Sequence, residues 1–192
     1  MTERHWFGLN AGASNWLWLG VTVMALDQWT KWLIVDRFEE FQQVVLLPVL
    51  EIMRLHNTGA AFSFLSNASG WQRWVFVGLG VAVSAGILVW LRRLPSKGQG
   101  MLAAGLSLIV GGALGNVIDR VLHGHVIDFI RVHWRDHYFP AFNVADSAIT
   151  IGAALIVLDN LLELDRVRAK KNVTSSYPRR SRSRRARPAH RS

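Results

Sequence analysis

The sequence predicts a mainly α-helical integral membrane protein with four transmembrane helices. Of its 192 residues, 51% are hydrophobic and nine are tryptophan, a composition too apolar for an ordinary soluble domain of this size. The apolar residues are also gathered into four runs that approach or exceed the roughly 17 to 25 residues needed to cross a hydrocarbon core. These runs place the predicted spans at residues 16–35, 71–91, 101–122 and 141–162.

The first predicted span contains two charged residues, Asp27 and Lys31, which lie four positions apart. This spacing places both side chains on one face of a helix, where they can form an ion pair. Lys31 can also extend its ammonium toward a membrane interface. Two interpretations stay open at this point: a structural ion pair, or a contribution of Asp27 to a functional site.

The segment at 36–70 follows the first span and includes the stretch FQQVVLLPVLEIMRLHNTGAAFSFL. Its apolar residues partly alternate from Val45 through Leu55, which predicts a short pair of strands. This small β element either rests on the bilayer or grips an apolar ligand, or it simply packs on the helices. Asn57, Thr58 and Gly59 then give a turn signal.

The third span carries a step of small residues, Gly111 and Gly115, which is typical of a close helix-packing face. Asn116 and Asp119 follow at once, three residues apart. In the fourth span, Asn143 and Asp146 have the same spacing. We therefore expect two helices that each present an amide and a carboxylate on one face.

The distribution of basic residues predicts the orientation in the membrane, because loops rich in Lys and Arg stay in the cytoplasm. The segments at 36–70 and 123–140 hold few of them and are predicted to face outward, with both termini in the cytoplasm. The tail at 166–192 has eleven Lys or Arg and is predicted to be disordered, separate from a membrane domain at 1–165. It can associate with anionic lipid, act only as an orientation signal, or bind RNA.

Three aspartates, Asp119, Asp128 and Asp146, lie inside or beside apolar segments. A charged aspartate at the centre of a transmembrane helix costs roughly 2.5 to 3.5 kcal/mol, so such residues usually have a function. Two carboxylates can activate one water for peptide hydrolysis, and the chain has no cysteine to supply a thiol nucleophile. Asn116, Asn143 and Arg120 are placed to orient the carboxylates and the substrate backbone. The residues alone do not decide whether Asp119 or Asp128 is the partner of Asp146.

Three other hypotheses remain open beside hydrolysis. A metal site is one, because four histidines crowd around Asp128: His123, His125, His133 and His137. No H-E-x-x-H motif is present, so these residues fit an interfacial belt better than a zinc site. The second is a proton pathway or carrier, although no internal repeat is visible. The third is a structural or assembly factor.

Four stretches together resemble one known family, the bacterial lipoprotein signal peptidases, also called signal peptidase II. They are LDQWTKWLI, HNTGAAFSFL, GGALGNVIDRVLHGHVIDFI and FPAFNVADSAITIG, which occur in the family's order between about residues 20 and 162. The resemblance implies an aspartic endopeptidase that removes the signal peptide from diacylglyceryl-modified prolipoproteins. The cleavage it implies is just N-terminal to the lipid-modified cysteine of the substrate.

The resemblance also implies the site residues and the setting of the enzyme. It assigns catalysis to Asp128 and Asp146, without a metal or any other cofactor. It assigns a supporting role to a polar set comprising Asn57, Asn116, Asp119, Arg120, Asn143 and Asp27. The implied fold has four transmembrane helices, a small extracytoplasmic β-cradle and a short extracytoplasmic helix. We expect a monomer in the bacterial inner membrane whose partners are prolipoproteins and lipids, not nucleic acid, with its active site near the extracytoplasmic face.

Overall fold

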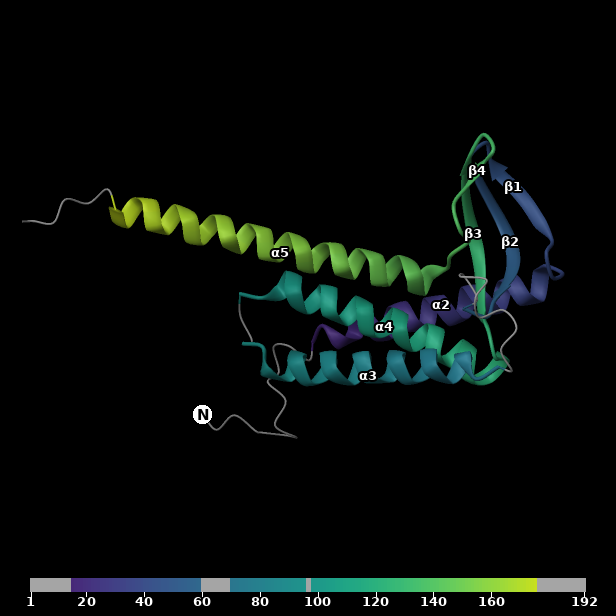
Figure 1. Cartoon of the computed structure of the whole chain (residues 1–192), viewed down its shortest axis with the longest axis horizontal. Helices are drawn as coiled ribbons and strands as arrows, with labels where there is room; N and C mark the ends of the chain where they lie inside the picture. The colour runs from purple at the N-terminus through teal and green to yellow at the C-terminus, as the bar shows by residue number, and fades with distance from the viewer. Residues whose placement is uncertain (1–14, 60–69, 96–97, 176–192) are drawn as a thin grey trace, which may run out of the picture.

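The computed structural model describes residues 15–59, 70–95 and 98–175. Its four long helices are α2 (Leu17–Arg37), α3 (Gln72–Arg93), α4 (Gly100–His123) and α5 (Val144–Ser175). Helix α4 is central and packs against the other three, and a small β-sheet stands across one end of the bundle (Figure 1). The mainly helical fold with a small sheet that the sequence predicted is confirmed.

Three of the four helices are long and apolar enough to cross a membrane: α3, α4, and α5 over Val144–Arg168. Helix α2 has 21 residues but does not meet the same hydropathy criterion, because polar residues interrupt its centre. Two of these, Asp27 and Lys31, are 0% and 2% exposed. Their charges therefore face the bundle, and the outward face of α2 is left apolar.

Exposed tryptophans lie near both ends of helices α2 and α3. Trp18 and Trp32 on α2 are 74% and 61% exposed, and Trp74 and Trp90 stand near opposite ends of α3. Tryptophan is enriched at the two interfaces of a bilayer. The residues of each pair are 14 to 16 positions apart, so they are separated by roughly 21 to 24 Å along a helix. This spacing suits the two edges of a hydrocarbon core and supports a membrane-spanning position for both helices.

Glycines bring α4 close to its neighbours, as the small-residue step in the sequence predicted. A Cβ at Gly111 would collide with the backbone of Gly20 on α2, and one at Gly112 would collide with the carbonyl of Ala145 on α5. A Cβ at Gly115 would lie 2.6 Å from a carboxylate oxygen of Asp27. The close approach of α2 and α5 to α4 follows from these missing side chains.

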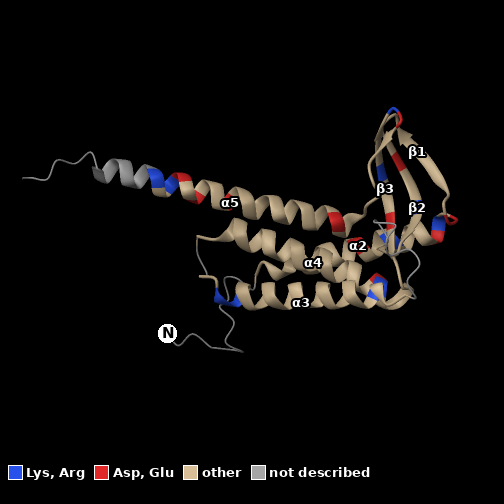
Figure 2. Ribbon diagram, in the orientation of Figure 1, with Lys and Arg blue, Asp and Glu red and all other residues tan. Residues whose placement is uncertain are grey.

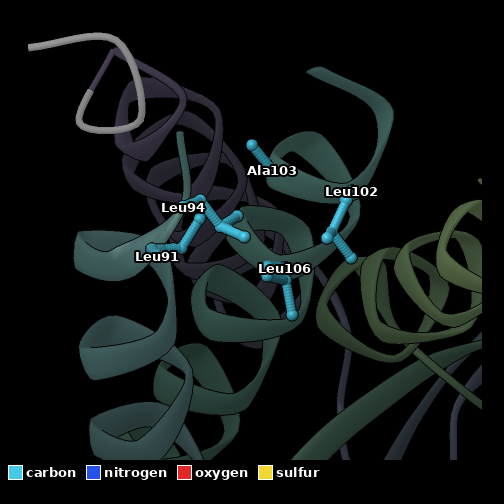
Figure 3. Close-up of a cluster of buried hydrophobic side chains, with 5 residues drawn as sticks. All are labelled: Leu91, Leu94, Leu102, Ala103 and Leu106. Carbon is cyan, nitrogen blue, oxygen red and sulfur yellow. The ribbon is translucent and has the colours of Figure 1, made fainter. Parts of the chain in front are cut away.

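Apolar side chains close the end of the bundle that lies away from the sheet. Figure 3 shows this cluster, in which the end of α3 meets the start of α4 through Leu91, Leu94, Leu102, Ala103 and Leu106. All five side chains are buried, with Leu106 only 1% exposed. The buried charged residues Asp27, Lys31 and Asp119 lie outside this apolar cluster.

The sheet is antiparallel in the order β1 (Gln43–Leu47), β2 (Leu50–Asn57), β3 (Val126–Trp134) and β4 (His137–Tyr138). Strands β1 and β2 confirm the strand pair predicted between Val45 and Leu55. Strands β3 and β4 were not predicted, since the sequence marked 123–140 only as an outer segment. The pairing of β2 with β3 sets Leu55 opposite Asp128, so the sheet fixes the position of that aspartate.

Charged residues gather at the ends of the helices and on the sheet, and the middle of the bundle surface is free of them in Figure 2. Arg92 and Arg93 end α3, and Arg166 and Arg168 follow the apolar part of α5. The C-terminal ends of α3 and α5 lie away from the sheet (Figure 1). This distribution supports the predicted cytoplasmic termini, which stay a prediction.

Helix α5 extends to Ser175, so the prediction that the chain is disordered from Arg166 is wrong for 166–175. This stretch holds no glycine or proline, and its Arg, Ala and Lys residues favour a helix. The predicted disorder of 176–192 lies outside the described residues. The described part of the chain contains no short helix beside the four long ones, and 60–69 of the outer segment also lie outside it.

Candidate active site

Two aspartates meet where the sheet joins the helices. Asp128 is on β3 and only 1% exposed, and Asp146 is half-buried in the first turn of α5. They lie close enough that the negative charge of Asp146 disfavours the ionised form of Asp128. The pair assigned to catalysis by resemblance is thus brought together from segments eighteen residues apart.

Two side-chain amides hold the carboxylate of Asp128. Asn57 Nδ2 donates to Oδ2 over 2.8 Å, and Asn143 Nδ2 donates to Oδ1 over 2.8 Å. Asn57 is itself fixed by a turn, in which the backbone N–H of Gly59 donates to Asn57 Oδ1 over 2.8 Å. Gly59 has a φ of 85°, a conformation that glycine adopts without strain. The predicted turn is confirmed, and it aims the amide of Asn57 at Asp128.

Asp146 is held by Asn116 and by the cap of its own helix. Asn116 Nδ2 donates to Asp146 Oδ1 over 2.8 Å. The backbone N–H of Asn143 donates to Asp146 Oδ2 over 3.3 Å, while the N–H of Asp146 donates to Asn143 Oδ1 over 2.9 Å. These reciprocal bonds form a capping box. The prediction that Asn143 and Asp146 share a helix face is therefore wrong, because Asn143 precedes α5 and caps it.

The pKa of Asp128 is raised to about 6, chiefly because burial disfavours its charged form. The hydrogen bond from Asn57 acts in the opposite direction, since it stabilises the carboxylate. The charge of Asp146 raises the pKa further, and the bond from Asn143 lowers it. Asp128 thus keeps its proton to a higher pH than an ordinary aspartate does.

Asp119 has a different environment, in which its carboxylate forms an ion pair with a buried cation. Lys31 Nζ lies 2.8 Å from Oδ2, the N–H of Ile127 donates to Oδ2 over 3.1 Å, and Gln28 Nε2 donates to Oδ1 over 2.9 Å. Ile127 is the residue before Asp128. The structure therefore answers a question that the sequence left open: Asp119 is an anchor for β3, and Asp128 is the carboxylate that meets Asp146.

Asp27 is the second carboxylate bound to Lys31, which confirms the predicted ion pair. Its Oδ2 lies 2.8 Å from Lys31 Nζ, and its Oδ1 accepts the backbone N–H of Ala145 over 2.9 Å. Asp27 thus binds the first turn of α5 beside Asp146. The sequence analysis did not assign Lys31 or Gln28 to the site. Their signal was the placement of both beside Asp27 inside an apolar span.

Arg120 lies at the edge of the site with a free donor. Its Nη1 donates to the carbonyl of Asn116 over 3.3 Å, and its guanidinium stands 5.0 Å from the ring centre of Phe76 on α3. Its Nε is buried and has no hydrogen-bond partner in the described part of the chain. Its positive charge interacts with both Asp128 and Asp146. The residue can therefore donate a hydrogen bond to a bound ligand.

Three of the four histidines considered as metal ligands, His123, His125 and His133, lie beside other aromatic rings. His133 lies against Tyr138 and Glu51, with Nε2 3.3 Å from a carboxylate oxygen of the latter. His125 instead stacks on His56, with ring centres 3.9 Å apart, and His123 lies 6.1 Å from His125. Within residues 15–59, 70–95 and 98–175, no group of three His, Asp or Glu side chains is arranged to hold a metal ion.

Two carboxyl groups held by neutral amides can act as a general acid and a general base. In contrast to Asp27 and Asp119, neither Asp128 nor Asp146 forms an ion pair with a cation among the described residues. A carboxylate without a salt-bridge partner can gain and lose a proton near neutral pH when burial raises its pKa. The arrangement therefore suits activation of a water molecule.

The chain is similar to known proteins over most of its length. The sequence matches the model of a family described as signal peptidase (SPase) II over residues 19–162. The lipoprotein signal peptidases of Pseudomonas fluorescens (strain Pf0-1) and Pseudomonas aeruginosa (strain PAO1) are each 53% identical to it over 150 residues, which cover 77% of this chain and 88% of each relative. That of Acinetobacter baylyi is 49% identical over 156 residues, covering 80% of this chain and 87% of the relative.

Two solved structures of bacterial membrane enzymes share the fold. The first is 31% identical, with a TM-score of 0.68, and the match covers 77% of this chain and 93% of that one. The second is 29% identical, with a TM-score of 0.69 and coverages of 86% and 95%. Because the family model spans most of the sequence, the chain belongs to the signal peptidase II family, whose members are membrane-bound proteases.

Proposed function

We propose that this protein is an aspartic endopeptidase that cleaves the signal peptide from diacylglyceryl-modified prolipoproteins. The cut falls just N-terminal to the lipid-modified cysteine of the substrate. Family membership and the lipoprotein signal peptidases among its relatives support the substrate class. The observation that carries the mechanism is the meeting of Asp128 and Asp146, each held by asparagine amides and neither bound to a cation.

In the proposed reaction, one water lies between the two carboxyl groups. Asp146 enters as the carboxylate and takes a proton from the water, whose oxygen bonds to the scissile carbonyl carbon. Asp128 enters protonated and donates to the carbonyl oxygen, which gives a tetrahedral intermediate. As the carbon–nitrogen bond breaks, the leaving nitrogen takes the proton held by Asp146, and one hydroxyl of the intermediate returns its proton to Asp128. The raised pKa of Asp128 favours its role as the acid, although the titration belongs to the pair.

Arg120 has the position of a substrate-binding residue. Its Nε is buried without a partner in the described region, and an unsatisfied buried donor is unfavourable until a ligand fills it. A backbone carbonyl of the extended substrate segment supplies the matching acceptor. Asn57, on the opposite side of the site, holds Asp128 from the sheet. The substrate would therefore lie between the sheet and the helices.

The exposed apolar residues of the sheet support a position of the proposed site at the membrane surface. Strand β1 exposes Val45, Leu46 and Leu47 by 55 to 62%, a surface suited to the outer leaflet and to a lipidated segment. Water reaches an active site at this depth, near the extracytoplasmic face. We propose a monomer of the bacterial inner membrane with both termini in the cytoplasm, in accord with the basic ends of α3 and α5.

A gel-shift assay tests this function directly. Purified protein would be mixed with a diacylglyceryl-modified prolipoprotein, and in parallel with the same substrate lacking the lipid. We expect cleavage of the lipidated form only, no cleavage by Asp128→Asn or Asp146→Asn, and unchanged activity after treatment with a chelator. Absence of cleavage by folded wild-type protein would refute the proposal and favour transport or assembly. Activity of either variant at the wild-type rate would refute catalysis by the pair Asp128 and Asp146, which we call the dyad.

A further inference from the structure

Lys31 occupies the centre of a buried polar cluster that touches the proposed dyad. Its side chain is 2% exposed, and its Nζ lies 2.8 Å from an oxygen of Asp27, 2.8 Å from one of Asp119 and 2.9 Å from Oδ1 of Asn116. An ammonium has three donor hydrogens, so all three are used. Because a buried charge is unfavourable without partners, this complete set of contacts holds Lys31 in one position.

The ammonium determines which way the amide of Asn116 points. An ammonium has no acceptor, so the group facing Lys31 must be the amide oxygen. Asn143 Nδ2 also donates to this oxygen, over 3.2 Å. The amide nitrogen of Asn116 is then directed at Asp146, 2.8 Å away. A flipped amide would set N–H against the ammonium and oxygen against the carboxylate, two repulsive contacts.

The two carboxylates bound to Lys31 hold the backbone beside each member of the dyad. Asp27 accepts the N–H of Ala145, the residue before Asp146, over 2.9 Å. Asp119 accepts the N–H of Ile127, the residue before Asp128, over 3.1 Å. Removal of the cation would leave two buried like charges close together, and both backbone contacts would be disturbed.

We infer that Lys31 is a positioning residue for the dyad: its ammonium fixes the amide of Asn116 as a donor to Asp146. Through Asp27 and Asp119 it also joins the start of α5 to β3. The lysine does not touch the reacting atoms, and its charge reaches Asp146 through a polarised amide. This inference rests on the proposed function and adds a residue to it.

A triple variant separates this role from a general role in folding. Lys31→Met combined with Asp27→Asn and Asp119→Asn removes the cation together with both buried anions, so no charge is left unpaired. Each asparagine still offers an oxygen to its backbone N–H. We expect a folded protein whose KM stays near the wild-type value and whose kcat falls about 100-fold, because a small misplacement of a catalytic group has such an effect.

A second variant tests the ammonium itself. Lys31→Ala would open space beside an existing cavity of about 220 Å³ lined by Gln28, Trp32, Asp119 and His123. Propylamine added to this variant should restore part of kcat, and propanol, which has a similar size but no charge, should not. Arg37→Met is the matched control, because Arg37 ends the same helix with a side chain 72% exposed, and it should leave activity unchanged.

The outcomes are distinct for the two proposals. A folded triple variant with wild-type kcat would overturn the positioning role, as would equal rescue by propanol and propylamine. If wild-type protein itself does not cleave the lipidated substrate, the proposed function fails first. A loss of kcat in the folded triple variant, with rescue of Lys31→Ala by the amine alone, would establish the inference.

Discussion

Two pairs of aspartates lie side by side in this protein, and their partners differ. Asp27 and Asp119 are bound to the ammonium of Lys31, and both hold a backbone N–H. Asp128 and Asp146 are bound to asparagine amides and backbone, and neither is paired with a cation in the part of the chain that the structure describes. We call the first set the ion cluster and the second the dyad. The residue type is the same in both, and only the partners separate them.

Burial alone does not distinguish the two sets. Asp27, Asp119 and Asp128 are all 0 to 1% exposed. A carboxylate paired with a cation is stabilised in its charged form, and an amide donor stabilises it less. The ion cluster is thus suited to hold geometry, and the dyad to exchange protons. The partner of a buried carboxylate, more than its depth, therefore indicates its role.

Neutralising the dyad should give the largest loss of activity. Asp128→Asn and Asp146→Asn each remove a proton carrier with little change in volume, so we expect cleavage to fall about 10,000-fold. The fold should persist, as measured by thermal unfolding in detergent. Activity within tenfold of wild type would show that other residues carry out catalysis. It would also contradict the different roles assigned to the dyad and the ion cluster.

Asp128→Asn should also raise the thermal stability at pH 7.5. The folded pKa of Asp128 is raised to about 6, so the folded protein loses stability as pH rises from about 4 through 6. The asparagine removes this penalty, and the gain in melting temperature should vanish when both proteins are compared near pH 4. A melting temperature lower than wild type at pH 7.5 would contradict the assignment.

Breaking the ion cluster should instead affect stability most. Lys31→Met leaves two buried carboxylates without their cation, which should reduce the free energy of unfolding by about 3 to 5 kcal/mol. The measurement is unfolding in detergent, compared with Arg37→Met, whose exposed charge should contribute little. Equal stability of Lys31→Met and wild type would show that the cluster is not a structural centre.

The pH dependence of cleavage should respond to Asn57. We expect kcat/KM to fall as pH rises through about 6, where Asp128 loses its proton. The bond from Asn57 lowers the pKa of Asp128, so Asn57→Ala should raise it, and the fall should move to higher pH. The rate at the optimum should decrease about tenfold with the lost hydrogen bond.

The matched control for this prediction is Asn160→Ala, at an exposed amide on α5 that bonds only the carbonyl of Ile156. It should leave the pH profile unchanged. A shift to lower pH in Asn57→Ala would contradict the assigned effect of this hydrogen bond on the pKa of Asp128.

The sequence was a good guide to the elements whose signal is local. Apolar runs predicted the ends of all four helices to within a few residues, except the C-terminal end of α5, which extends to Ser175. Alternation of apolar residues predicted β1 and β2. Strand β3 was missed because its pairing partner β2 lies some seventy residues away. Spacing placed Asp27 and Lys31 on one face, but it could not show that Asp119 completes their cluster. The choice between Asp119 and Asp128 therefore depended on resemblance until the contacts were known.

Deletion of the residues after Arg168 should have the smallest effect, because Asp146 and Ala145, which contact the two sets, lie at the opposite end of α5. The last turns of α5 before that point are exposed, with Leu161, Leu164 and Val167 at 43 to 54%. We expect cleavage in detergent within about twofold of wild type. An inactive truncation in detergent would instead show that the dyad depends on the far end of α5.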